Sequence, residues 1–237
     1  MFRLTRPLVM LAGIMLASGP ALAQQRLPTI PPEQYTAEQK KAAEEFLVAR
    51  KVPVFGPFEP MMHSPEVMSI ARSTGDYLRY HSAIGNTLSE LVILVTAREW
   101  SQDYEWFVHQ PIALKAGISK DIADAIADGR RPAKMSADEE IVYDFTIELQ
   151  KNKRVSDATF SAAEQRFGKK GVVDMVGISG YYTSLAMQLN TARYQFSGEG
   201  PRLSRFRTDR GADDRLGSDS DLDARDKEVR FTQERTS

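Results

Sequence analysis

Hydrophobic residues recur every three or four positions along most of the chain, which is the spacing of one face of an α-helix. The run at 91–95 could form a buried strand on its own, but its length and the capping box Thr87-x-x-Glu90 favour a helix. Hairpin signals, repeats and alternating strands are absent from the sequence. The pattern predicts an all-α fold, a single domain of about six to eight helices, at 36–51, 65–80, 88–100, 102–116, 121–128, 137–151, 157–167 and 171–194.

Polar caps and helix breakers mark the ends of these elements. Gly117, Gly129 and Gly168 stand where helices should stop. Pro111 lies inside the helix predicted at 102–116, where it should kink or restart the helix just after His109, unless it is simply tolerated there. Hydroxyl side chains stand where N-caps are expected, namely Thr36, Ser64, Ser119, Ser136 and Ser156.

The first residues have the order of a cleavable secretory signal. Arg3 and Arg6 precede an uncharged apolar stretch at 7–20, and an Ala-Leu-Ala sequence at 21–23 supplies the small residues that a signal peptidase reads. The apolar stretch is about a dozen residues, whereas a membrane-spanning helix needs roughly 20. We expect cleavage after Ala23, a secreted or periplasmic location, and no stable membrane insertion afterwards.

Composition divides the remainder into three parts. Residues 24–33, rich in Gln and Pro, are expected to form an extended leader before an all-helical domain at 34–196. Within 201–237, nine basic and nine acidic residues stand among 37. Because so few large apolar side chains accompany them, we expect a disordered charged tail at 197–237, or alternatively a segment that docks on a partner.

Charge and cysteine content exclude several functions. Loss of Arg3 and Arg6 from the 31 basic residues leaves 29 against 32 acidic ones, which gives no reason to expect nucleic acid as a partner. The chain contains no cysteine, so neither disulfides nor thiol catalysis are available to it. A small molecule or another copy of the chain is the expected partner.

Three groups capable of acid/base chemistry fall within twenty residues of sequence. Glu90 lies on one predicted helix, and Glu105 and His109 lie four residues apart on the next. The second pair shares one helix face, so it can hydrogen-bond directly or converge on one ligand. Without further information, Glu90 could equally be a helix cap or a site residue. Glu105 and His109 could form an ordinary surface ion pair instead of a site.

Aromatic residues and the other histidines are weaker candidates. Tyr104 and Trp106 flank Glu105, and either could line a pocket or belong to the core. His63 and His81 stand near expected turns, where either could serve a pocket or be an ordinary histidine. The histidines and acids show no recognised ligand spacing, so we expect no metal and no cofactor.

The sequence resembles the carboxymuconolactone decarboxylase-like family, which includes the alkylhydroperoxidase D-type proteins. The resemblance covers about residues 85–195 and rests on Leu-Ser-Glu-Leu at 88–91, Tyr-Glu-Trp at 104–106, and His109, with further matches at Ala113, Gly117 and Gly129. It implies an alkylhydroperoxidase D-like helical fold that assembles into a trimer or hexamer.

The same resemblance separates two branches of chemistry. The interval Glu90-x18-His109 matches the one that connects the characteristic acid and histidine of the alkylhydroperoxidase D-type members. Those members carry a Cys-x-x-Cys pair where this chain has Gln102 and Glu105. A thiol peroxidase cycle needs a thiolate to attack and a second thiol to resolve, so the resemblance points to the branch without the pair.

In the decarboxylase branch, CO2 leaves a lactone carboxylate through a stabilised carbanion or enol. The resemblance implies that His109 is the general acid/base, that Glu105 orients it or shares its proton, and that Glu90 fixes the imidazole. Tyr104, Trp106 and His81 are the expected substrate-binding residues.

The expected function is therefore an exported, cofactor-free acid/base enzyme, a carboxymuconolactone decarboxylase-like lyase acting on a small carboxylated or lactone-type substrate. One alternative is a catalytically silent helical oligomer that binds a small ligand. A second alternative is a peroxide-defence role by a route that uses no thiol.

Overall fold

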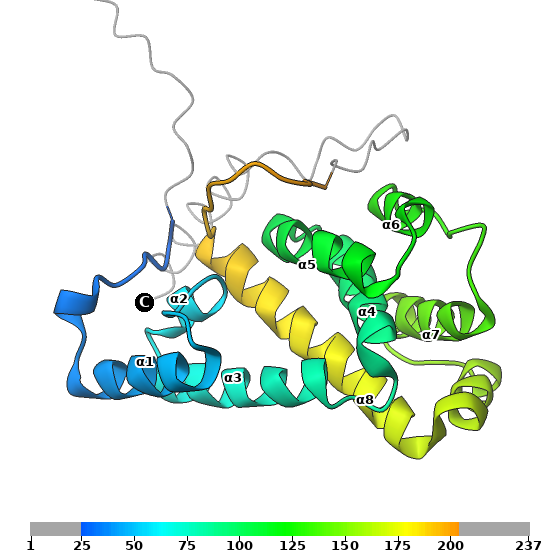
Figure 1. The fold of residues 1–237 in the computed structure, drawn as a ribbon, viewed down its shortest axis with the longest axis horizontal. Helices are drawn as coiled ribbons and strands as arrows, with labels where there is room; N and C mark the ends of the chain where they lie inside the picture. The colour runs from blue at the N-terminus through cyan, green and yellow to red at the C-terminus, as the bar shows by residue number, and fades with distance from the viewer. Residues whose placement is uncertain (1–24, 204–237) are drawn as a thin grey trace, which may run out of the picture.

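The computed structural model describes residues 25–203, and every regular element in that range is helical (Figure 1). This confirms the predicted all-α class. A short 3-10 turn, η1 (Pro32–Gln34), precedes eight α-helices in the described range, which are α1 (Ala37–Arg50), α2 (Phe58–Met61), α3 (Pro65–Tyr80), α4 (Gly85–Glu99), α5 (Asp103–Ala116), α6 (Lys120–Ala127), α7 (Ala137–Asn152) and α8 (Asp157–Ala192).

Helix α4 is the centre of the domain. It packs against α5, α7 and α8, while α1 and α3 lie against each other and α3 contacts α8 (Figure 1). Every residue of α4 from Ser89 to Arg98 is buried. Burial on all sides explains why the segment 91–95 is apolar without helical periodicity, and the structure confirms that it is a helix.

The capping box predicted at Thr87 and Glu90 is wrong. α4 begins earlier, at Gly85, and its N-cap Ile84 makes no side-chain capping hydrogen bond. The Thr87 hydroxyl instead donates to the carbonyl oxygen of Ala116 at the end of α5, over 2.6 Å. Thr87 therefore ties two helices together, and Glu90 is not engaged in capping.

The other predicted helix ends are largely confirmed. Thr36 and Ser136 form capping boxes, and Ser119 and Ser156 accept capping hydrogen bonds, whereas Ser64 forms none. α5 ends at Gly117 with a φ of 113°, and Gly168, with a φ of 67°, divides α8 into two helical parts. α5 continues from Asp103 to Ala116, so the restart expected after His109 does not occur and Pro111 is accommodated.

The segment before α1 lies against the helical body. The backbone N–H of Arg26 donates to the carbonyl oxygen of Ala192 at 2.8 Å, and His63 Nε2 is 3.0 Å from the carbonyl oxygen of Pro28. α2 was not predicted, because three prolines in nine residues indicate only a break. Its Phe58 is buried against Phe46, with ring centroids 5.0 Å apart.

The predicted signal at 1–23 and most of the predicted tail, 204–237, lie outside the described residues. Between residues 25 and 203, no helix is both long enough and apolar enough to cross a membrane.

Candidate functional site

His109 lies between two buried carboxyl groups, one from α4 and one from its own helix. Its Nδ1 is 2.7 Å from Glu90 Oε2, and its Nε2 is 3.6 Å from Glu105 Oε2. All three residues are at most 3% exposed. Because a carboxylate only accepts hydrogen bonds, His109 donates through Nδ1 and presents Nε2 to Glu105. The structure thus brings together the three residues singled out in the sequence.

The connection between α4 and α5 fixes this geometry. Ser101 adopts a left-handed conformation with a φ of 47°, which turns the chain directly from one helix into the next. The Gln102 side chain then accepts from the backbone N–H of Tyr104 at 2.7 Å and donates to Asn190 of α8 at 2.7 Å. Gln102 therefore anchors the first turn of α5, from which Glu105 projects inward.

Burial raises the pKa of the Glu105 carboxyl above its ordinary value. The neighbouring Glu90 raises that pKa further, while His109 and Arg79 oppose the shift. Within residues 25–203, the Oε1 atom of Glu105 is buried without a hydrogen-bond partner. A protonated Glu105 faces Nε2 of His109 across 3.6 Å, slightly longer than a hydrogen bond, so the two residues share one proton when their side chains move closer together.

The raised pKa gives a testable dependence of stability on pH. The stability that comes from protonated Glu105 is fully present below the unfolded pKa, about 4.5, and is lost as pH rises through the higher folded pKa. Glu105→Gln has no such loss, so its melting temperature should rise relative to wild type as pH increases above about 4.5. Melts across a pH series measure this difference.

Glu148 provides a control for which the stability difference should change with pH in the opposite direction. Hydrogen bonds from the Ser156 backbone and the Thr159 hydroxyl lower the pKa of this partly exposed carboxyl. Its contribution is present above the unfolded pKa, so Glu148→Gln should lose stability relative to wild type as pH rises. A Glu105→Gln difference that is constant with pH would contradict a raised pKa.

A small, partly open cavity of about 30 Å³ adjoins Glu105 and His109, roughly the volume of one water molecule. Tyr182 of α8 forms one wall, and its ring stands edge-on to the imidazole with centroids 5.0 Å apart. Burial raises the pKa of Tyr182 well above its ordinary value, so its hydroxyl stays protonated. The sequence marked Tyr182 only as a core or contact residue.

Two arginines from outside the motif region also border this cavity. Arg79, near the end of α3, places Nη2 3.8 Å from Glu90 Oε1. Arg50, the last residue of α1, pairs with Asp76 at 2.9 Å. Each occupies the last turn of a helix, where sequence alone favours a role at the helix dipole. Only the packing of α1 and α3 shows that both reach the site.

The three predicted substrate-binding residues are placed differently. Tyr104 lines the cavity. Trp106 is buried in the core and does not border the cavity. His81 is exposed at the end of α3, beside the ring of Tyr77, and is also absent from the cavity wall. Among residues 25–203, no group of three or more His, Cys, Asp or Glu is arranged to hold a metal ion.

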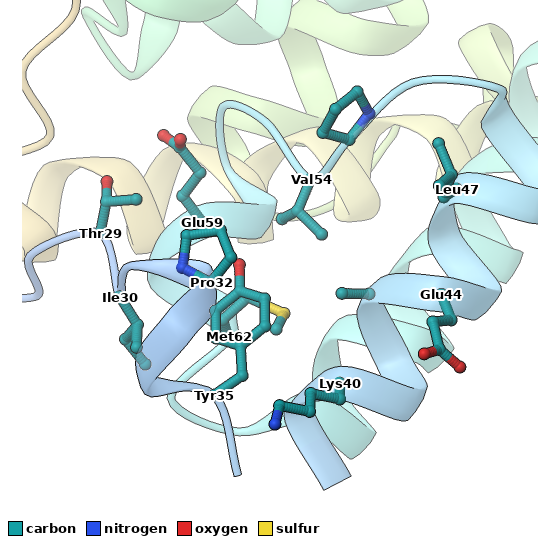
Figure 2. Close-up of a pocket in the computed structure, with 12 residues that line it drawn as sticks. Thr29, Ile30, Pro32, Tyr35, Lys40, Glu44, Leu47, Val54, Glu59 and Met62 are labelled. Atoms are coloured by element: carbon teal, nitrogen blue, oxygen red, sulfur yellow. The ribbon is translucent and has the colours of Figure 1, made fainter. Parts of the chain in front are cut away.

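A larger and more apolar cavity, about 500 Å³ in volume, lies between α1, α2 and the segment before α1 (Figure 2). Figure 2 shows Tyr35, Leu47, Val54 and Met62 around it. Glu59 also borders this cavity, and its carboxylate accepts a hydrogen bond from the Tyr194 hydroxyl. We call it the outer cavity, to distinguish it from the inner cavity beside His109.

Comparison with solved structures shows what this fold is similar to. A crystal structure described as the alkylhydroperoxidase AhpD core of an uncharacterized peroxidase-related protein from Ralstonia eutropha superposes with a TM-score of 0.58. The match covers 72% of this chain and 91% of the other at 15% sequence identity, which establishes similarity of fold. No protein-family model matches the sequence, and no curated protein matches it.

Proposed function

We propose that this chain, which has the alkylhydroperoxidase D-like fold, is an exported, cofactor-free acid/base enzyme acting on a small carboxylated or lactone-type substrate. The observation that carries the proposal is the placement of His109 between two buried carboxyl groups, with an unpartnered oxygen of Glu105 at the inner cavity. Within residues 25–203, this oxygen, Oε1, has no hydrogen-bond partner. Perturbed acid/base groups beside a cavity are typical of proton-transfer sites.

The chemistry is a decarboxylation that needs no oxidant. The C–C bond to the substrate carboxylate breaks, CO2 leaves, and the electron pair is delocalised as an enolate. The Glu105–His109 pair delivers its shared proton to the resulting carbanion carbon and recovers one from water. Glu90 holds the imidazole through Nδ1, which keeps Nε2 directed at Glu105. A thiol peroxidase cycle is not available, because the chain contains no cysteine.

Turnover of a defined panel tests this proposal. Purified protein is incubated with carboxylated lactones and β-keto acids, and CO2 release is measured against buffer. We expect at least one member to react faster than the uncatalysed rate, whereas a panel with no acceleration would count against the enzyme. Export and assembly into a trimer or hexamer belong to the same proposal. Intact mass of periplasmic protein and light scattering test those two parts.

The outer cavity favours a second candidate function, that of a catalytically silent small-ligand-binding protein. Its volume of about 500 Å³ lies within the range of small-molecule sites, and its walls include Leu47, Val54 and Met62. An apolar ligand would bury these side chains without requiring any of the acid/base residues. Binding at this cavity and turnover at the inner one are separable in experiments.

Filling the outer cavity should abolish such binding. Ala43 lines it, so Ala43→Phe should weaken the binding of a naphthalene-sulfonate dye by about tenfold or more. Fluorescence titration measures the affinity. Val48→Phe is the matched control, because Val48 lies on the same helix but is exposed and borders neither cavity. Equal affinities in the two variants would exclude the outer cavity as the dye site.

A further inference from the structure

Arg79 has hydrogen-bonding capacity that the described chain does not use. Its side chain is 17% exposed, and its nearest carboxylate oxygen, Oε1 of Glu90, lies at 3.8 Å, beyond hydrogen-bond distance. Its Nε is buried without a partner within residues 25–203. A guanidinium carries five N–H donors in a planar fork, and buried donors of this kind are normally satisfied. The fork borders the inner cavity, where Glu105 also leaves an oxygen unpartnered.

Arg50 is held rigidly at the same cavity. Its guanidinium lies 4.9 Å from the ring centroid of Phe58 and 5.6 Å from that of Phe46. The Nη2 atom of Arg50 forms an ion pair with Asp76 at 2.9 Å. In the described part of the chain, the Nε atom of Arg50 is also buried without a hydrogen-bond partner. Stacking and one ion pair fix the plane of the guanidinium while leaving donor capacity at the cavity.

We propose that Arg79 and Arg50 form an anion subsite that binds the carboxylate group of the substrate and thereby determines its class. This inference rests on the proposed function, because it orients a carboxylated molecule toward the Glu105–His109 pair. A planar guanidinium fork matches the two oxygens of a carboxylate, and such charge-assisted pairs are stronger than neutral hydrogen bonds. Both arginines come from α1 and α3, outside the part of the chain that carries the acid/base motif.

The surroundings favour a carboxylate over a phosphate. The inner cavity is only about 30 Å³, and a carboxylate is smaller and flatter than a tetrahedral phosphate. Apolar rings from Phe55, Phe58 and Tyr181 border the same space and suit an organic body attached to the anion. The cavity is partly open, and Phe55, at 36% exposed, is the lining phenylalanine less enclosed by the protein.

Direct binding of acetate and propanoate to the full chain tests the subsite without requiring turnover. Isothermal titration should show binding to wild type that weakens by about tenfold or more in Arg79→Met and in Arg50→Met, since each removes a charged donor group. Arg72→Met is the matched control, because Arg72 lies on α3 and pairs with the same Asp76 but does not border the cavity. Its affinity should equal that of wild type.

Arg79→Lys provides a second variant if Arg79→Met fails to fold, as judged by circular dichroism. Arg79→Lys keeps the positive charge but loses the planar pair of guanidinium donors, so acetate affinity should still fall below that of wild type. Acetate binding that is absent from wild type, unchanged in the folded arginine variants, or replaced by phosphate binding would overturn the subsite. Binding that depends on Arg79 in a protein without any turnover would support the subsite and count against the proposed activity.

Discussion

Replacing His109 with alanine should reduce turnover to the uncatalysed rate while α4 and α5 remain helical. The imidazole lies between Glu90 and Glu105, with one ring nitrogen facing each, so its loss interrupts proton sharing across the cluster. Glu105→Gln keeps the shape but cannot transfer a proton, and should lower the rate by about 10²-fold or more, the usual contribution of a positioned acid/base group. Steady-state kinetics and circular dichroism on the same preparations measure both effects.

Gln110→Ala is the matched control for these variants. Gln110 is the next residue on α5 but does not border the inner cavity, so its replacement should leave the rate constant near wild type. A folded His109→Ala protein with wild-type activity would refute the catalytic assignment. Loss of activity accompanied by loss of helicity would instead assign His109 a structural role.

Glu90→Ala should be among the most destabilising single changes at the site. Glu90 is 1% exposed and provides the carboxylate that faces both His109 Nδ1 and Arg79 Nη2. Removing one partner from a buried charged set typically costs about 3–5 kcal/mol, because the remaining groups stay buried without compensation. Urea denaturation of wild type and variant measures the difference in unfolding free energy.

Two further variants show what causes this loss. Glu90→Gln retains an oxygen that can accept from His109, so it should cost less than Glu90→Ala. Glu44→Ala, at an exposed position on α1, should change the free energy of unfolding by no more than about 0.5 kcal/mol. A Glu90→Ala protein as stable as wild type would show that the carboxylate does not hold the cluster together.

Local sequence signals were sufficient to predict most of the fold. Apolar spacing and polar caps predicted the α1 and α7 boundaries closely, because Thr36 and Ser136 form their capping boxes with residues three positions away. Gly117 and Gly168 end helical stretches because each adopts a positive φ that other residues reach only with strain. In each case the determining interaction lies within a few residues of the chain.

The features that the sequence did not predict correctly depend on packing between segments that are distant in the chain. Thr87 has the sequence of a cap, but its hydroxyl partner is the Ala116 carbonyl, 29 positions away. α2 is only four residues long and owes its position to burial of Phe58 and Met61 rather than to periodicity. Neither interaction can be predicted from a short stretch of sequence, because each depends on how the helices pack.

The same distinction applies to the site. Glu105 and His109 were found because four residues make one helical turn, which places both on one face. Trp106 is one position from Glu105, yet successive residues point about 100° apart on a helix, and it enters the core instead. Arg50 and Arg79 were missed because they reach the inner cavity only through the packing of α1 and α3.

The central claim is that the Glu90–His109–Glu105 cluster transfers a proton to or from carbon. Incorporation of deuterium from D2O into the panel of carboxylated lactones and β-keto acids, followed by proton NMR, measures that step even where CO2 release is slow. We expect incorporation by wild type above the buffer rate for at least one compound, and none above that rate by His109→Ala. Incorporation at the wild-type rate by folded His109→Ala, or none by wild type with any compound, would contradict it.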